Sequence, residues 1–273
     1  MSVARIGGAR QARPAAGDMA LGAFSGLVYL FLYLPLVVVV LYSFSATKVN
    51  AWPIEGYTVD WYRQLTHDEE IQSALRLSVI VGSIAAGIAV VLGSLTAMAL
   101  DRYRFRGKPA IRFLVVLPIA LPGIVTGVAM LSFFSLLGWD LSRWTIIIGH
   151  ATFCITLVLN NVVARLSQLP RHLDEASADL GATPWRTFWR VILPLIRPAI
   201  LSGAILAFTL SFDEVIVTFF LTGREKTLPL LIWGRLRQGI SPEINAVATV
   251  IVVVSLGGVL LANRIGRRVG TSG

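Results

Sequence analysis

Apolar stretches long enough to cross a lipid bilayer recur along this chain and limit what it can fold into. A membrane-spanning helix needs about 20 mostly apolar residues. Stretches of about that length or more lie at residues 19–44, 75–100, 111–137, 144–166, 199–221 and 244–262. With 55% hydrophobic and 14% charged residues, the chain is too apolar for a soluble domain of its length. We therefore predict an all-α membrane protein with six transmembrane helices.

Lysine and arginine residues between these stretches predict how the chain is oriented. Such residues favour the cytoplasmic side, and they gather in the arm before residue 19, in the loop at 102–108 and in the tail after residue 263. We therefore expect both termini in the cytoplasm. The first apolar stretch is too long for a secretory signal core, so we expect an uncleaved helix there. The net charge is +9, but the basic residues lie between the apolar stretches rather than along one face of a helix. This distribution argues against a nucleic-acid partner.

The loop at about residues 222–243 departs from this charge rule. It is expected outside the cytoplasm, yet it carries four basic residues, Arg224, Lys226, Arg235 and Arg237. The rule is statistical and later loops contribute less to orientation, so these charges fit a tolerated exception. The other interpretation is a basic patch that contacts an acidic extracytoplasmic partner. Both interpretations stay open at this point.

Two prolines interrupt the third apolar stretch. Pro118 and Pro122 lie about one helical turn apart, and each removes a backbone hydrogen bond from the helix. We predict a kink or a broken helix at this point. Irregular backbone is tolerated at membrane depth where neighbouring helices pack on it or where it lines a cavity. Both prolines are therefore candidates for a substrate pathway.

The loop at residues 167–197 carries helix signals of its own and predicts two short helices. Gly181 is expected to cap the end of the first, Thr183 and Pro184 to begin the second, and Pro194 to end it. The first helix has a small apolar stripe, formed by Leu173, Ala176, Ser177 and Leu180. Two functions fit this hairpin. It is either an amphipathic element that lies on lipid headgroups, or a knob of small residues inserted into a groove of another protein.

The spacing within this loop resembles the EAA loop of ABC importer permeases. That pattern is Glu-Ala-Ala, three residues, Gly, nine residues and Ile-x-Leu-Pro. Here it reads Glu175-Ala176-Ser177, Gly181 and Val191-Ile192-Leu193-Pro194, with conservative changes at Ser177 and Val191. The resemblance covers about residues 71–264 and implies a type I ABC importer permease fold, in which the loop forms a coupling helix seated in an ATP-binding subunit. The implied coupling residues are Glu175, Ala176, Ser177, Leu180, Gly181 and Pro194.

The same resemblance implies how the chain is organised and what it assembles with. Residues 1–70 would hold a cytoplasmic arm, the first transmembrane helix and an extracytoplasmic segment. Residues 71–265 would form the permease core with the coupling loop at 167–197, and residues 266–273 a cytoplasmic tail. The implied partners are a second permease in a heterodimer, two ATP-binding subunits and an extracytoplasmic solute-binding protein. The implied location is the bacterial plasma (inner) membrane, which the chain would cross several times in contact with lipid.

Two acidic residues in the fifth apolar stretch bear on the substrate. The segments Ser211–Glu214 and Ser241–Ala246 resemble the second permease subunit of spermidine/putrescine importers. Carboxylates within a membrane are costly, so Asp213 and Glu214 are expected to be functional or paired. They fit a cation pathway, and they fit equally a structural ion pair or a hydrogen-bonded cap with the partner permease. Gly123 departs from the acidic residue that many polyamine permeases carry there, so a different small solute remains the alternative, such as an amino-acid-like compound, an opine or a metal ion.

Enzymatic chemistry has little support in the sequence. Gly107 and Lys108 precede a proline and lack the spaced glycines of a phosphate loop, so ATP hydrolysis is expected in a partner subunit. The three histidines are dispersed, and His150 is expected to be a packed, hydrogen-bonded residue. The single cysteine, Cys154, allows neither a disulfide framework nor a metal site of several cysteines. We expect no catalytic residues, no metal and no cofactor in this chain. A secondary transporter is the further alternative, and a requirement for ATP would separate the two.

Overall fold

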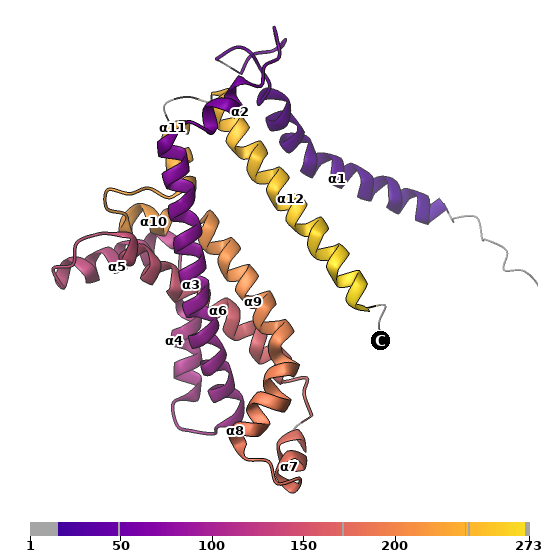
Figure 1. Ribbon diagram of the computed structural model, residues 1–273, viewed down its shortest axis with the longest axis vertical. Coiled ribbons are helices and arrows are strands. Elements are labelled where there is room, and N and C mark those ends of the chain that lie inside the picture. The colour runs from indigo at the N-terminus through magenta and orange to yellow at the C-terminus, as the bar shows by residue number, and fades with distance from the viewer. Residues whose placement is uncertain (1–15, 49, 171, 238, 240, 271–273) are drawn as a thin grey trace, which may run out of the picture. The chain divides into compact units, whose positions relative to one another are not determined.

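The computed structural model describes residues 16–48, 50–170, 172–237, 239 and 241–270, and its side chains as far as Gly257. Every regular element in these ranges is helical (Figure 1). Contacts divide the chain into two compact units. One unit comprises residues 1–65 and 240–273, and the other comprises residues 66–239. The basic residues of the N-terminal arm lie outside the described residues, and the side chains of the basic C-terminal tail are also undescribed.

The first unit contains α1 (Ala16–Tyr42), α2 (Asp60–Leu65) and α12 (Pro242–Gly270). α12 packs against both other helices. The segment after α1 is held by polar contacts, since the indole Nε1 of Trp61 donates to the carbonyl oxygen of Ser45 at 2.7 Å. None of the described side chains of α1 is buried up to Val38, although the helix is apolar on all sides. A helix of this kind is stable in lipid rather than in water.

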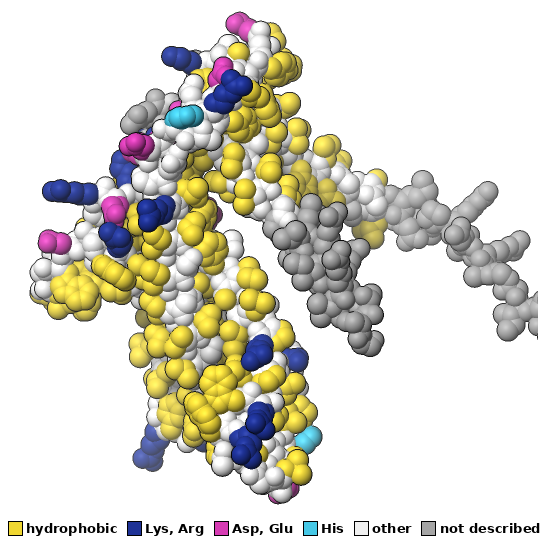
Figure 2. All heavy atoms as spheres, viewed as in Figure 1, with side chains coloured by type: hydrophobic (Ala, Val, Ile, Leu, Met, Phe, Trp, Pro, Cys, Tyr) yellow, Lys and Arg dark blue, Asp and Glu magenta, His cyan; other side chains and the backbone are white. Residues whose placement is uncertain are grey.

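Three long helices form the core of the second unit: α3 (Glu69–Arg102), α6 (Arg143–Leu166) and α9 (Leu193–Asp213). Small residues bring their backbones close together. A Cβ atom at Gly93 would lie 2.9 Å from the carbonyl oxygen of Ile155, and one at Gly203 would lie 3.0 Å from Cα of Val158. Lipid gives apolar helices no hydrophobic reason to associate, so close packing of this kind holds the core together. Figure 2 shows hydrophobic side chains over the middle of this unit and charged side chains mostly towards its two ends.

The predicted break at the two prolines is confirmed. The chain bends by 108° between α4 (Lys108–Ala120) and α5 (Gly123–Leu136). Pro118 lies inside α4, whereas Pro122 precedes α5 and holds Leu121 in an extended conformation with ψ 147°. α5 then packs on the short helix α10 (Ile216–Leu221), because Gly127 leaves no side chain where a Cβ would lie 2.5 Å from the Phe220 ring.

The expectation of one continuous helix over residues 199–221 is wrong. α9 ends at Asp213, the backbone at Glu214 is extended with φ −74° and ψ 121°, and α10 begins two residues later. No proline or glycine lies at this break. Side chains of α6 contact residues on both sides of this break.

Four helical runs in the described residues are long and apolar enough to span a membrane: residues 20–42, 69–102, 143–166 and 184–213. The bent pair α4 and α5 adds a fifth run if it is counted as one span. α12 is apolar over Pro242–Gly257. The count of six transmembrane helices and the cytoplasmic placement of both termini stay predictions.

Candidate functional site

The predicted helical hairpin lies between α6 and α9, and its turn follows the expected chemistry. α7 (His172–Asp179) ends before Gly181, whose φ of +76° lies in the left-handed region that favours glycine. The amide of Gly181 donates to Ala178 O at 2.8 Å, and that of Ala182 donates to Ser177 O at 3.0 Å. Thr183 then caps α8 (Pro184–Thr187) by accepting from the amide of Arg186 at 3.4 Å. The predicted caps at Gly181 and Thr183 are confirmed.

A buried hydrogen bond closes the hairpin of α7 and α8. Oγ of Ser177 and Oγ1 of Thr187 lie 2.8 Å apart, and Thr187 also donates to Thr183 O at 3.2 Å. Because Thr187 has one hydroxyl proton, Ser177 is the donor in this pair. The serine that replaces the second alanine of the EAA pattern therefore adds a bond between the two arms.

The predicted apolar stripe of α7 is split between two faces. Ser177 is buried and Leu173 is half-buried, whereas Ala176 is exposed and Leu180 is 89% exposed. Glu175 is also exposed, and Trp185 on α8 presents 71% of its surface to solvent. The hairpin therefore has one face that packs on its own unit and another face that is free to contact a partner.

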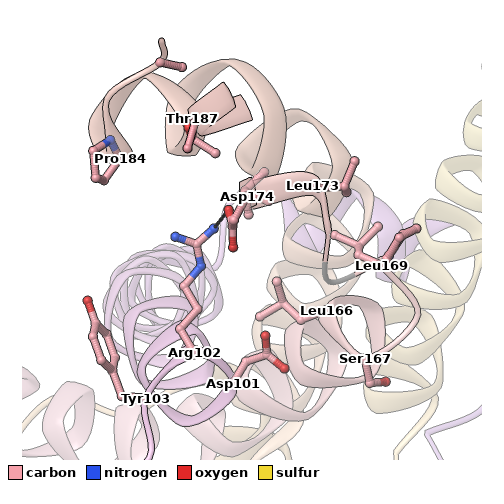
Figure 3. Close-up of a pocket in the computed structure, with 14 residues that line it drawn as sticks. Asp101, Arg102, Tyr103, Leu166, Ser167, Leu169, Leu173, Asp174, Pro184 and Thr187 are labelled. Atoms are coloured by element: carbon pink, nitrogen blue, oxygen red, sulfur yellow. Dashed lines mark hydrogen bonds and ion pairs between the residues drawn. The ribbon is translucent and has the colours of Figure 1, made fainter. Parts of the chain in front are cut away.

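An ion pair ties this hairpin to the end of α3. Nη2 of Arg102 lies 2.6 Å from Oδ1 of Asp174 on α7. Figure 3 shows the two side chains reaching towards each other across a cavity of about 600 Å³. Arg102 served in the sequence only as a marker of topology, so its contact with a residue 72 positions away was missed.

The expectation that Pro194 ends the second short helix is wrong. The helix continues from α8 through a π-helical segment (Phe188–Ile192) into α9, giving one helical run of 30 residues, Pro184–Asp213. The amide of Leu193 donates to Phe188 O, five residues back, as in a π-helix. Pro194 lies in the first turn of α9, where its missing amide proton has little cost because the ladder has already shifted.

The two carboxylates of the fifth apolar stretch lie at the break between α9 and α10. Asp213 is exposed, and Glu214 is half-buried. Oε1 of Glu214 accepts a hydrogen bond from the amide of Val217 at 3.0 Å, so this carboxylate caps the first turn of α10 within its own chain. The ion pairs found among the described residues include neither carboxylate.

The structure brings the two helix breaks together. Gly123 begins α5 and Ile216 begins α10, and a Cβ at Gly123 would lie 3.5 Å from Cβ of Ile216. The break at Pro122 therefore adjoins the break that carries Asp213 and Glu214. These residues were selected separately in the sequence, and their proximity supports a single site.

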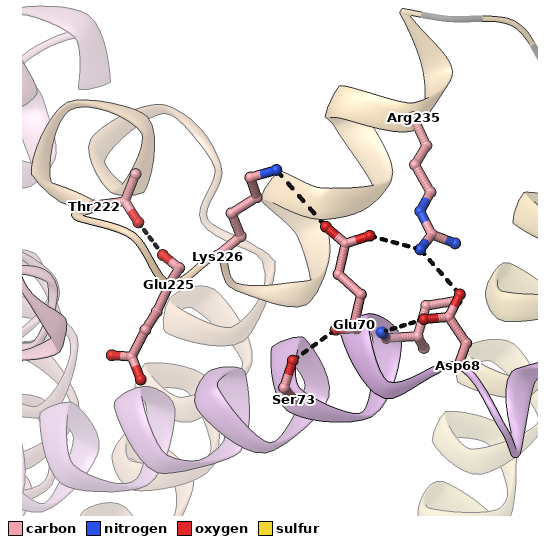
Figure 4. A network of polar contacts seen from close by, with 8 residues as sticks. Asp68, Glu70, Ser73, Thr222, Glu225, Lys226 and Arg235 are labelled. Carbon is pink, nitrogen blue, oxygen red and sulfur yellow. Dashed lines mark hydrogen bonds and ion pairs between the residues drawn. The ribbon is translucent and has the colours of Figure 1, made fainter.

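The basic residues of the 222–243 loop have partners that the sequence did not reveal. Nη2 of Arg235, on α11 (Leu228–Leu236), lies 3.0 Å from Asp68 Oδ2 and 2.9 Å from Glu70 Oε2 (Figure 4). Nζ of Lys226 lies 3.7 Å from the other oxygen of Glu70. The guanidinium of Arg237 stacks on Trp233, 3.7 Å from the ring centre.

These contacts show that basic residues of this loop bind acidic residues of the same chain. Arg224 lines a small cavity with Glu70 and Glu225. Two of the four basic side chains therefore form ion pairs with the start of α3, an explanation that neither sequence interpretation included. Contact with a partner protein stays a prediction for this loop.

The Asp68 contacts predict a pH dependence. Burial raises the pKa of Asp68, but the amide of Ile71 and the Arg235 guanidinium outweigh it and hold the pKa below its usual value. The stabilisation is therefore complete above the unfolded-state value of about 4 and is lost as the pH falls through the lower folded-state pKa. We expect thermal unfolding in detergent to show this loss below about pH 4, and D68A to lose about 1 kcal/mol at neutral pH with the cap.

D68N separates charge from capping in this prediction, because asparagine also caps helices well. It should flatten the Asp68 part of the pH dependence and keep most of the stability. D140N, at an exposed position, is the matched control. An unchanged pH profile in D68N would show that the charge of Asp68 does not contribute to stability.

Comparison with known proteins agrees with this arrangement. Residues 89–271 match the family described as binding-protein-dependent transport system inner membrane component. The chain is 37% identical over 253 residues to the spermidine/putrescine transport system permease protein PotC of Escherichia coli (strain K12), covering 92% of this chain and 95% of the relative. It is 40% identical over 235 residues to the putrescine transport system permease protein PotI of the same strain, covering 83% of each.

Solved structures show the same fold at lower identity. A chain of a bacterial alginate ABC transporter, in complex with its alginate pentasaccharide-bound periplasmic protein, matches with a TM-score of 0.71 and 19% identity over 93% of this chain and 96% of that chain. A chain of the MetNI methionine ABC transporter matches with a TM-score of 0.58 and 19% identity over 78% of this chain and 99% of that chain. This chain belongs to the family of binding-protein-dependent transport system inner membrane components, and it is a membrane-spanning permease subunit of an ABC importer.

Proposed function

We propose that this chain and a second permease form the translocation pathway of an ATP-driven importer for polyamines such as spermidine and putrescine. The carrying observation is the placement of Asp213 and Glu214 at a break between helices, beside the break at Pro122. A polyamine carries several positive charges and loses water as it enters the membrane. Carboxylates there offset that loss of hydration. The names of the relatives PotC and PotI support the same substrate class.

The hairpin of α7 and α8 is the proposed contact with an ATP-binding subunit. Its exposed face includes Glu175, Ala176 and Leu180, and its turn at Gly181 is fixed by hydrogen bonds. ATP would be hydrolysed in the partner subunits, two per transporter, and the membrane chain itself would catalyse no reaction. The match of this loop to the spacing of the EAA pattern favours a protein groove over lipid headgroups as the surroundings of this face.

The loop at residues 222–243 is the proposed contact with an extracytoplasmic solute-binding protein. Arg224 and Arg237 would provide charge at its surface, while Lys226 and Arg235 hold the loop against α3. The periplasmic protein seen with the related alginate transporter supports a partner of this kind.

Uptake by the complete transporter tests this function. The chain would be reconstituted in liposomes with its second permease, its ATP-binding subunits and its binding protein. We expect radiolabelled putrescine or spermidine to accumulate only when ATP is present on the side of the membrane where the ATP-binding subunits lie. Accumulation of an amino acid, an opine or a metal ion instead would overturn the substrate class. Uptake driven by a proton gradient without ATP would support a secondary transporter.

A further inference from the structure

A buried histidine bridges the break that carries the two carboxylates. His150 on α6 has no exposed surface, as expected for a packed, hydrogen-bonded residue. Its Nδ1 lies 2.7 Å from Oγ of Ser211 in the last turn of α9, and its Nε2 lies 2.9 Å from Oγ1 of Thr218 on α10. One imidazole therefore binds a residue before and a residue after the segment Asp213–Glu214.

The hydroxyl partners of His150 indicate which of its ring nitrogens donates a hydrogen bond. The Thr218 hydroxyl donates its one proton to the carbonyl oxygen of Glu214 at 2.9 Å. It therefore accepts from Nε2–H of His150, and Nδ1 faces the Ser211 hydroxyl. Both ring nitrogens thus have a hydrogen-bond partner within the chain.

Other contacts from α6 hold the same short helix. Oγ1 of Thr145 lies 2.7 Å from the carbonyl oxygen of Leu221, at the end of α10, and 2.7 Å from that of Ser142, so its one proton is shared between the two acceptors. Gly149 allows Leu221 to approach, because a Cβ there would lie 2.3 Å from Cδ1 of that leucine. α10 is therefore bonded to α6 at Thr218 and packed on it at Leu221, while the backbone at Glu214, between α9 and α10, is extended.

We propose that His150 is a positioning residue for the substrate pathway, which fixes the extended segment between α9 and α10 and thereby sets where Asp213 and Glu214 lie. This inference rests on the proposed role of the two carboxylates. His150 is buried and bonded to Ser211 and Thr218, so it acts through the backbone it holds rather than on the substrate. Loss of its hydrogen bonds should free the segment while the core of α3, α6 and α9 remains packed.

Kinetics of the reconstituted transporter give the first test. H150L removes both hydrogen bonds, and we expect at least a tenfold lower kcat for putrescine uptake. The KM for the substrate-loaded binding protein should stay unchanged, because docking takes place elsewhere. H150N keeps an acceptor towards Ser211 and H150Q keeps a donor towards Thr218, so both should recover part of the activity. T156V is the matched control, since Thr156 is a buried residue of α6 that bonds to Val115 on α4 instead.

A second measurement reports on the segment itself and does not depend on transport. Cys154 is the single native cysteine, so V215C in a C154A background places one thiol in the break while keeping both carboxylates. We expect H150L to change the labelling rate of V215C by a water-soluble thiol reagent at least threefold, and T156V to leave it near the parent rate. If H150L fails to fold, the pair S211A and T218V removes the same two hydrogen bonds, and T218V alone reports the added loss of the bond from Thr218 to Glu214 O.

The outcomes separate this inference from the proposed function. Parent-like labelling and parent-like uptake in a folded H150L, or in the S211A and T218V pair, would overturn the role of His150 alone. If neutralised carboxylates transport normally while H150L still changes the labelling, the pathway proposal fails and the anchoring by His150 stands. A raised KM with unchanged kcat would also contradict a positioning role.

Discussion

Uptake of a polyamine should fall to background when both carboxylates at the break after Asp213 are neutralised as D213N and E214Q. Each carboxylate that meets a partly dehydrated cation contributes about 1.5–3 kcal/mol, so each single change should lower uptake about 10- to 100-fold. ATP hydrolysis by the complex should continue, because the hairpin that would contact the ATP-binding subunit is unaltered. The measurement is uptake of radiolabelled putrescine and ATP hydrolysis in the same liposomes.

The structure allows charge to be separated from backbone capping in this experiment. The side-chain oxygen of glutamine can still accept from the amide of Val217, so E214Q removes the charge of Glu214 and keeps the cap. E214A removes both and should also reduce the stability of the break. D140N, at an exposed site outside both the hairpin and the break, is the control for a lost negative charge elsewhere. Normal uptake by the double variant would show that the carboxylates are structural.

Replacing Gly181 with valine should uncouple ATP hydrolysis from uptake or release the ATP-binding subunits. The φ of +76° at this position costs a residue with a side chain about 1–2 kcal/mol, and a β-branched residue more. The turn would have to change, and the bonds from Gly181 and Ala182 back to α7 would be lost. We expect uptake to fall at least tenfold, measured together with ATP hydrolysis and with the amount of ATP-binding subunit that copurifies.

A matched glycine controls for backbone strain in general. Gly107 has a φ of +92° before α4, and like Gly181 it has open space where a Cβ would lie. G107V should therefore carry a similar local strain away from the hairpin and keep coupled transport. Equal loss of coupling in both variants would assign the effect to strain. Unchanged coupling in G181V would count against the hairpin as the contact with the ATP-binding subunit.

The sequence was most informative where structure follows from chemistry close along the chain. The cap at Gly181, the start of α8 at Thr183 and the broken helix at Pro122 each depend on a few neighbouring residues, and each is confirmed. Pro194 misled because a π-helical turn before it removed the need for its amide proton. A proline in the sequence does not reveal whether the helix before it has α-helical or π-helical hydrogen bonds.

The remaining features depend on residues far apart in the chain. The break at Glu214 follows no proline or glycine and is held by side chains of α6 more than 60 positions earlier. Arg235 pairs with Asp68, 167 positions earlier in the chain. From the sequence, its charge was only an exception to the rule that basic residues lie on the cytoplasmic side. Pairings of this kind require the fold, since no periodicity or composition along the chain encodes them.

One helical run, Pro184–Asp213, joins the hairpin to the break that carries the two carboxylates. At 1.5 Å per residue, its 30 residues extend about 45 Å, from the hairpin at one end to Asp213 at the other. α9 packs on α3 and α6 along the way, so its carboxylate end is held by the core of the unit. A displacement of the hairpin would therefore reach the break along this one run, against the hold that His150 has on the residues before and after it.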